Sequence, residues 1–139
     1  SVGQEVRVRV DTAFKLHPKG WKPKYVQAGF VTMGILRDEL DIPGDTDDVR
    51  IENYYRMPRP GILTTFEPHM HASGKRMCVE AIYQDGRREM LNCAGYNHNW
   101  VKVYSYDEDV SPLLPAGTVM HVIGWYNNTP SNPKLATIQ

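Results

Sequence analysis

The 139-residue chain lacks several features that would define a function class at once. No apolar run approaches the roughly 20 residues that a transmembrane helix needs. Lysine plus arginine and aspartate plus glutamate both number 16, so the formal net charge is zero. Such a chain has no positive field to draw it to nucleic acid or to an acidic membrane. It has only two cysteines, but at this length it can bury a core without several disulfides. We therefore expect one domain over residues 1–139, with no nucleic-acid partner and no membrane span.

Helical periodicity and internal repeats are also missing, and turn residues are common instead. Ten prolines and eleven glycines are spread through the chain. Val6, Val8 and Val10 alternate with arginines, which is the period of a half-buried strand. Further runs rich in apolar and β-branched residues cover 77–83, 88–93, 101–106 and 118–126. The pattern predicts an all-β fold, an antiparallel β-sandwich of jelly-roll-like form.

The two cysteines flank a predicted hairpin. Asp85-Gly86 is a strong type I′ turn signal between two predicted strands. If these two residues form the turn, Gln84 faces Arg87 and the register sets Cys78 opposite Cys93, at a hydrogen-bonded pair within disulfide reach. The alternative is two small buried hydrophobic side chains in a reducing compartment. We predict the disulfide.

The disulfide bears on location. Disulfides persist in oxidising compartments, so we expect a periplasmic or extracellular protein. The chain begins at Ser1 rather than at methionine. We expect it to be a mature or excised product, with any targeting segment lying outside it.

Charge is unevenly distributed near the N-terminus. Four lysines lie within residues 15–24, and we interpret this basic stretch as solvated and partner-facing. Seven acidic residues lie within 38–52. Closely spaced carboxylates suit calcium, but the spacing is not that of an EF-hand, so a solvated acidic loop is the preferred interpretation.

Two histidines carry the strongest chemical signal. His69 and His71 lie one residue apart at the start of a segment predicted to be a strand. Residues i and i+2 of a strand share a face, so the two imidazoles could close on one metal ion. Imidazole is a common ligand for copper, zinc and iron. Glu67 could orient one of the rings or simply face water. The alternative is two solvated or half-buried histidines without a metal.

Other ring side chains have structural interpretations. His121 is in phase with Val119, Ile123 and Trp125, which predicts a hydrogen-bonded core histidine rather than a ligand. Trp21, Trp100 and Trp125 are core candidates first.

Five ordered segments together resemble a known family. They are 69–75 (HMHASGK), 83–87 (YQDGR), 99–100 (NW), 114–118 (LPAGT) and 125–129 (WYNNT). Over about residues 60–133 the chain resembles the C-terminal domain of the copper type II, ascorbate-dependent monooxygenases. This group contains the peptidylglycine α-hydroxylating and dopamine β-monooxygenases, and the likeness is greatest to bacterial members.

The resemblance implies a copper site. Family members fold as two jelly-roll-like β-sandwiches that each hold one copper ion. The C-terminal domain uses a His-x-His pair and a methionine thioether, and the matching pair here is His69 and His71. A soft thioether favours Cu(I), the form that meets dioxygen. The electron-transfer domain needs a His-His dipeptide, and this chain contains none.

The chain departs from the family at the methionine ligand. In the family that residue lies downstream of the segment matching Asn132-Pro133, and this chain ends at Gln139. None of its six methionines matches by motif. Met120 and His98 are candidate substitute ligands, and His98 is equally a candidate surface histidine. A partner protein or domain could also supply the third ligand or electrons.

Three hypotheses follow. The preferred one is a secreted or periplasmic copper-binding β-sandwich module with one copper ion, acting as a subunit or accessory domain of a larger assembly. The second is the oxygen-activating half of a monooxygenase. The third is a structural β-sandwich with a vestigial metal site. Enzymatic activity remains undecided by the sequence, because neither the electron-transfer domain nor the expected methionine is present.

Overall fold

The computed structural model describes residues 3, 5, 7–26 and 40–135. Among them it contains strands but no α-helix, and hence no helix that could cross a membrane. The strands are β1 (Val49–Arg56), β2 (Gly61–Ile62), β3 (Thr65–Phe66), β4 (Gly74–Ile82), β5 (Arg88–Gly95), β6 (Tyr104–Ser105), β7 (Leu113–Leu114) and β8 (Val119–Tyr126).

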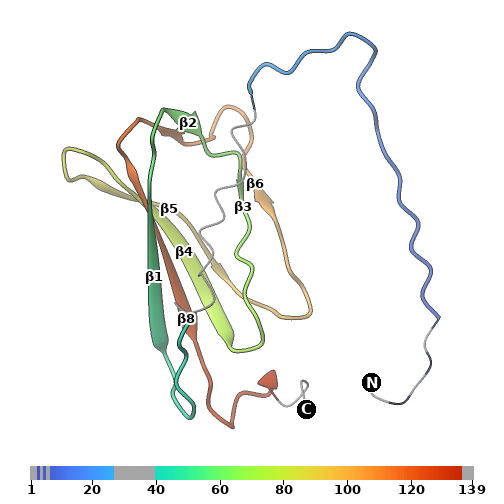
Figure 1. Ribbon diagram of the computed structural model, residues 1–139, viewed down its shortest axis with the longest axis vertical. Helices are drawn as coiled ribbons and strands as arrows, with labels where there is room; N and C mark the ends of the chain where they lie inside the picture. The colour runs from blue at the N-terminus through green and yellow to red at the C-terminus, as the bar shows by residue number, and fades with distance from the viewer. Residues whose placement is uncertain (1–2, 4, 6, 27–39, 136–139) are drawn as a thin grey trace.

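The strands form an antiparallel β-sandwich (Figure 1). The main sheet has the order β1-β8-β4-β5, and the short pairs β2-β7 and β3-β6 lie against it. The core between them contains six buried residues from five strands: Phe66, Val79, Ala81, Ala94, Leu114 and Met120. The predicted all-β sandwich is therefore confirmed.

Side chains of the main sheet alternate between its two faces, as the pleat requires. On β8, Met120 packs in the core, and Tyr126 packs in a second buried cluster with Met70 and Tyr96. His121 and Trp125 occupy alternate positions on the same strand and therefore lie on the outer face. One face of the sheet thus closes the core, and the other carries polar and aromatic side chains.

The β4–β5 hairpin reaches the predicted cysteine pairing by a different route from the one expected. The turn is not the two-residue type I′ turn, because the Tyr83 amide donates to the Arg87 carbonyl and three residues lie between them. A β-bulge near Leu91 then shifts the register back by one residue. Cys78 consequently faces Cys93 and forms the predicted disulfide. Their Cα atoms lie 4.0 Å apart, close to the spacing of a non-hydrogen-bonded pair rather than the wider pair we expected.

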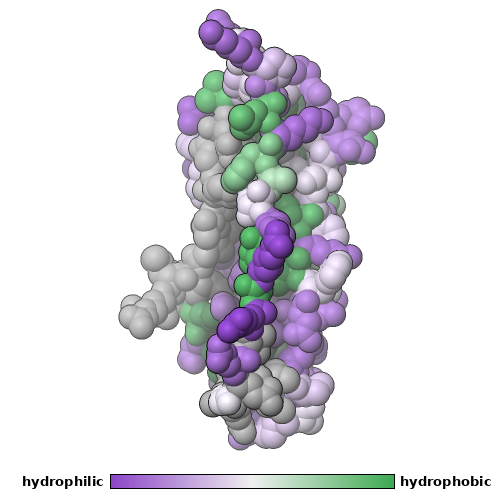
Figure 2. All heavy atoms as spheres, turned by 90° about the vertical axis from the view of Figure 1, so that its right-hand side faces the viewer, coloured by the Kyte–Doolittle hydropathy of each residue, from purple (hydrophilic) through white to green (hydrophobic). Residues whose placement is uncertain are grey.

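The predicted strand at residues 6–10 is wrong for the part that the structure describes. Residues 7–10 belong to no strand, and Val8 and Val10 are 78% and 80% exposed; Val6 lies outside the described residues. They begin an extended N-terminal arm, residues 7–26, that runs beside the sandwich (Figure 1). Figure 2 views the molecule from that side, where green apolar side chains lie at the surface among purple polar ones.

Two of the three predicted core tryptophans are also exposed. Trp21 lies on the arm, where it stacks on His17 with ring centroids 3.6 Å apart and is 50% exposed. Trp100 follows β5 and is 66% exposed. Trp125 is half-buried on the outer sheet face, with the Arg76 guanidinium 4.1 Å from its ring centroid. Local hydrophobicity alone therefore misplaced Trp21 and Trp100.

Candidate metal centre

His69 and His71 lie in the connection between β3 and β4, just before the strand in which we expected them. Burial alternates along this extended segment: both histidines are exposed, whereas Met70 and Ala72 are 2% and 1% exposed. Met70 packs in the buried cluster with Tyr96. Because Met70 points into the protein, its two neighbours project outward. The ring centroids of His69 and His71 lie 5.6 Å apart, with an angle of 69° between the ring planes.

This separation fits two imidazoles on one ion. A metal–nitrogen bond of about 2.0 Å places a ring centroid about 3 Å from the metal. Two rings sharing an ion at angles from about 90° to 180° then have centroids roughly 4.2 to 6.0 Å apart. The observed 5.6 Å falls within this range.

Few polar groups compete for the two rings. Among the described residues, the nearest charged partner is the carboxylate of Glu67, whose Oε1 lies 3.7 Å from Nδ1 of His69. That distance is longer than a hydrogen bond. The His69 imidazole remains accessible to a ligand, and Glu67 stands close enough to orient it through a small shift.

The turn after His71 is held by its neighbours. The carbonyl of His71 accepts a hydrogen bond from the amide of Gly74 at 2.7 Å. A Cβ at Gly74 would lie 2.6 Å from Cβ of Met70 and 3.0 Å from a ring carbon of Tyr96. Only glycine fits there. The turn therefore packs closely against Met70 and Tyr96, and this packing sets the position of His69 and His71 on the surface.

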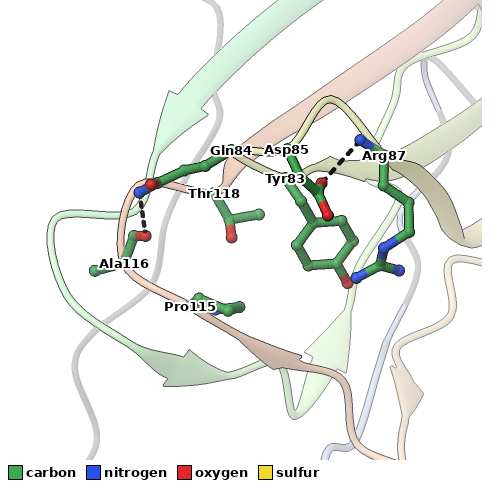
Figure 3. A pocket seen from close by; sticks show the side chains of 7 residues that line it. All are labelled: Tyr83, Gln84, Asp85, Arg87, Pro115, Ala116 and Thr118. Atoms are coloured by element: carbon green, nitrogen blue, oxygen red, sulfur yellow. Dashed lines mark hydrogen bonds between the residues drawn. The ribbon is translucent and has the colours of Figure 1, made fainter.

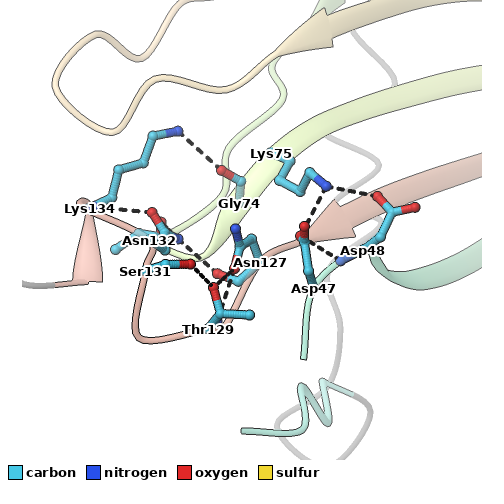
Figure 4. A network of polar contacts seen from close by, with 10 residues as sticks. Asp47, Asp48, Gly74, Lys75, Asn127, Thr129, Ser131, Asn132 and Lys134 are labelled. Atoms are coloured by element: carbon cyan, nitrogen blue, oxygen red, sulfur yellow. Dashed lines mark hydrogen bonds and ion pairs between the residues drawn. The ribbon is translucent and has the colours of Figure 1, made fainter. Parts of the chain in front are cut away.

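A second set of contacts anchors the same turn from the chain after β8 (Figure 4). The amide of Asn127 donates to the carbonyl of Ser73, and the side-chain amide of Asn132 donates to the carbonyl of Ala72. Asn127 also accepts from the amide and the hydroxyl of Thr129. The sequence placed 125–126 at the end of a predicted strand and 125–129 in the family resemblance, and the anchoring role of Asn127 was missed.

The acidic stretch before β1 meets a lysine. Nζ of Lys75 lies 3.0 Å from Asp47 and 2.9 Å from Asp48 (Figure 4). The hydrogen bond from Lys75 lowers the pKa of Asp47. These contacts agree with a solvated acidic loop paired to a cation. Asp38 and Glu39, which belong to the same stretch, lie outside the described residues.

A third ligand is not assembled around the pair by the described part of the chain. It contains no group of three or more histidine, cysteine, aspartate or glutamate side chains arranged to hold a metal. His98 is exposed and makes an edge contact with Tyr96, centroid to centroid 6.4 Å, so it lies at the same end of the sandwich. Met120 packs in the apolar core, where its thioether has apolar neighbours. The ligand role of both stays a prediction.

His121 is buried and hydrogen-bonded, as the sequence predicted, but it lies on the outer face of the main sheet rather than in the core. It is 3% exposed, and its ring nitrogens lie 2.7 Å from Glu80 and 2.9 Å from Glu52. The Tyr54 ring stacks on it at 4.3 Å, and the Tyr54 hydroxyl donates to Glu52. That hydrogen bond, reinforced by His121 and Arg50, lowers the pKa of Glu52.

A shallow hollow lies at the other end of the sandwich (Figure 3). The β4–β5 turn and the turn before β8 line it, with Gln84 donating to the carbonyl of Ala116 at 2.9 Å. The Arg87 guanidinium lies over the Tyr83 ring and pairs with Glu89. The charges of Arg87 and Glu89 therefore satisfy one another, and the Asp85 carboxylate accepts a hydrogen bond from the Arg87 amide.

Comparison with known proteins adds no assignment: no protein-family model, curated protein or solved structure matches this chain.

Proposed function

We propose that this chain is a copper-binding β-sandwich module that holds one ion through His69 and His71. The observation that carries the proposal is the pair of exposed imidazoles whose centroids lie 5.6 Å apart above a buried Met70. The resemblance of residues 69–75 and four further segments to copper monooxygenases supports copper over zinc or iron.

The module is proposed to work in the periplasm or outside the cell. The Cys78–Cys93 disulfide supports an oxidising compartment. An ion held by two imidazoles keeps open coordination positions, which a partner protein or domain would fill or use. Bound copper would supply one-electron redox chemistry at this surface, while Met70 and Gly74 hold the two histidines in place.

A module is preferred to an independent enzyme because of the ligand set. An oxygen-activating site needs a further ligand and an electron source. The described residues bring together His69 and His71 with Glu67 nearby, and no third histidine joins them as a group. The oxygen-activating half of a monooxygenase remains the alternative if His98 or a partner completes the site.

The test is copper titration of the purified chain, followed by calorimetry and by electron paramagnetic resonance. We expect about one Cu(II) per chain with nitrogen hyperfine couplings, as a two-imidazole site produces. His69→Ala and His71→Ala should each remove that binding. His17→Ala is the matched control, because His17 lies on the arm and stacks on Trp21.

His98→Ala separates the two copper hypotheses. A loss of affinity in this variant would favour a three-histidine site and the monooxygenase alternative, whereas unchanged binding favours the two-histidine module. Full copper binding in the double variant His69→Ala/His71→Ala would show that copper binds elsewhere and would overturn the proposal. A wild-type chain that binds no copper would also overturn it and would leave a structural β-sandwich with a vestigial site.

A further inference from the structure

The N-terminal arm, residues 7–26, exposes more apolar surface than a solvated tail needs. Its exposed apolar side chains are Val8, Val10, Phe14, Leu16 and Val26, each 78–91% exposed. Within the described residues, the arm touches the sandwich through the side chains of Lys24 and Tyr25, which both reach Glu108. The arm is extended and runs apart from the sandwich (Figure 1).

The arm has the pattern of a strand without a sheet. In an extended backbone, Val8 and Val10 lie on one face and Arg7 and Arg9 on the other. Alternation of this kind fits one buried and one solvated face. In this chain neither face is buried, so pairing with a sheet edge would remove apolar area from water and satisfy the backbone amides and carbonyls.

One edge of the main sheet is open for such pairing. Among the described residues, β1 pairs with β8 on one side and has no strand on the other. It is eight residues long and contains no proline, whereas exposed edges are normally short, covered or interrupted. The opposite edge, β5, is partly covered, because the Tyr106 hydroxyl donates to the carbonyl of Leu91 at 3.2 Å.

The charge of the loop before β1 favours the same edge. The arm is basic, with Arg7, Arg9 and four lysines against Asp11. The loop that leads into β1 is acidic, and its Asp41 and Asp45 carboxylates are exposed. Opposite charges on a strand and its acceptor steer the encounter and select the partner.

We infer that the arm of one chain adds a strand to the β1 edge of a second copy, and that the two copies exchange arms symmetrically. The arm of the same chain does not face that edge, since Figure 1 places the arm and β1 on opposite sides of the sandwich. Residues 7–17, which precede the turn that the Trp21 amide closes on the Pro18 carbonyl, span roughly 36 Å at about 3.3 Å per residue, which is long enough to reach along the edge of a neighbouring copy. Reciprocal exchange closes a two-fold dimer, the commonest soluble assembly.

The test is sedimentation equilibrium of the full chain over a range of concentrations, with a chelator present so that no shared metal can link two copies. We expect a monomer–dimer equilibrium. Val8→Asp/Val10→Asp should raise the dimer dissociation constant at least about tenfold, because two charges would enter the strand interface. The matched control is Val103→Asp/Val110→Asp, which changes two valines that are 55% and 64% exposed and lie outside the arm and β1. This control should leave the dimer unchanged.

A charge exchange tests which edge accepts the arm. Arg7→Glu/Lys15→Glu and Asp41→Lys/Asp45→Lys should each weaken the dimer, and the combined variant should regain association. A wild-type chain that stays monomeric at every concentration would overturn the inference. A dimer that responds to the arm substitutions but not to Asp41→Lys/Asp45→Lys would overturn the assignment to β1.

Discussion

Nδ1 of His121 lies 2.7 Å from Oε1 of Glu80, and both side chains are buried on the outer side of the main sheet. Glu52 on β1 contacts the other ring nitrogen at 2.9 Å. Three neighbouring strands, β1, β8 and β4, are thereby joined by one imidazole. His121 and the two carboxylates thus cross-link the main sheet. This sheet contains β4, which directly follows the segment of the candidate metal centre.

Removing the His121 imidazole should destabilise the fold. We expect His121→Ala to lower the free energy of unfolding by about 3 kcal/mol, because the substitution leaves the buried Glu80 carboxylate with only its longer, 3.5 Å contact to Arg88. Urea denaturation followed by circular dichroism measures the loss. His17→Ala, on the exposed arm, should change the free energy by less than about 0.5 kcal/mol. Equal stability of the two variants would show that the Glu80 contact adds nothing.

Stability should fall on acidification. The Tyr54 hydroxyl lowers the pKa of Glu52, and the hydrogen bond from Lys75 lowers that of Asp47. A carboxyl group with a lowered folded-state pKa binds its proton more readily when the chain is unfolded. Its contribution is therefore fully present above the ordinary carboxyl pKa and is lost as the pH falls through the lowered value.

Urea midpoints from neutral pH down to about pH 3 test this expectation. Glu52→Gln should flatten the profile below the ordinary carboxyl value of 4.5, because it removes one of the titrating groups. A variant profile parallel to that of the wild type would argue against Glu52 as a source of the acid sensitivity.

The disulfide should contribute strongly to stability. Cys78 and Cys93 are 15 residues apart in sequence, and closing a loop of that size stabilises a fold by about 3 kcal/mol through the unfolded chain. Cys78→Ala/Cys93→Ala should lose about that amount in urea denaturation. Reductant should destabilise the wild type and leave the double variant unchanged. Two free thiols in denatured, non-reduced protein would contradict the disulfide itself.

The turn after the histidines offers a test of how the pair is positioned. Gly74→Ala would place a Cβ 2.6 Å from Cβ of Met70, so the turn must move. We expect a loss of roughly 1 to 3 kcal/mol in stability, together with weaker copper binding at His69 and His71. Gly95→Ala is the matched control, because a Cβ there meets no atom within 4 Å. Weakened copper binding in Gly95→Ala as well would show that the effect is not specific to the turn.

Prediction from sequence succeeded where the signal is local and repeated. The alternation in 77–83 and 118–126 identified β4 and β8. The spacing of His69 and His71 likewise predicted that the two imidazoles lie on the same side of an extended chain, as they do. The same alternation at Val8 and Val10 did not produce a strand, because a strand also needs a neighbour with which to pair. β1 was missed altogether, although the structure makes it an edge of the main sheet.

The Cys78–Cys93 pairing was predicted correctly, but the hairpin that produces it differs from the predicted one. The expected turn was one residue too short, and a bulge near Leu91 restored the register that brings Cys78 opposite Cys93. A bulge depends on how the strand packs against its neighbours, and the spacing of residues in the hairpin carries no sign of it.

The sequence by itself determined the all-β class, the cysteine pair and the outward projection of two imidazoles, because each depends on strand periodicity or short-range spacing. Only the tertiary structure decided that His121 lies between carboxylates from two other strands and that Asn127 and Asn132 anchor the turn after His71. Those contacts join residues that are dozens of positions apart, and their partners are chosen by how the strands pack rather than by neighbours in the chain.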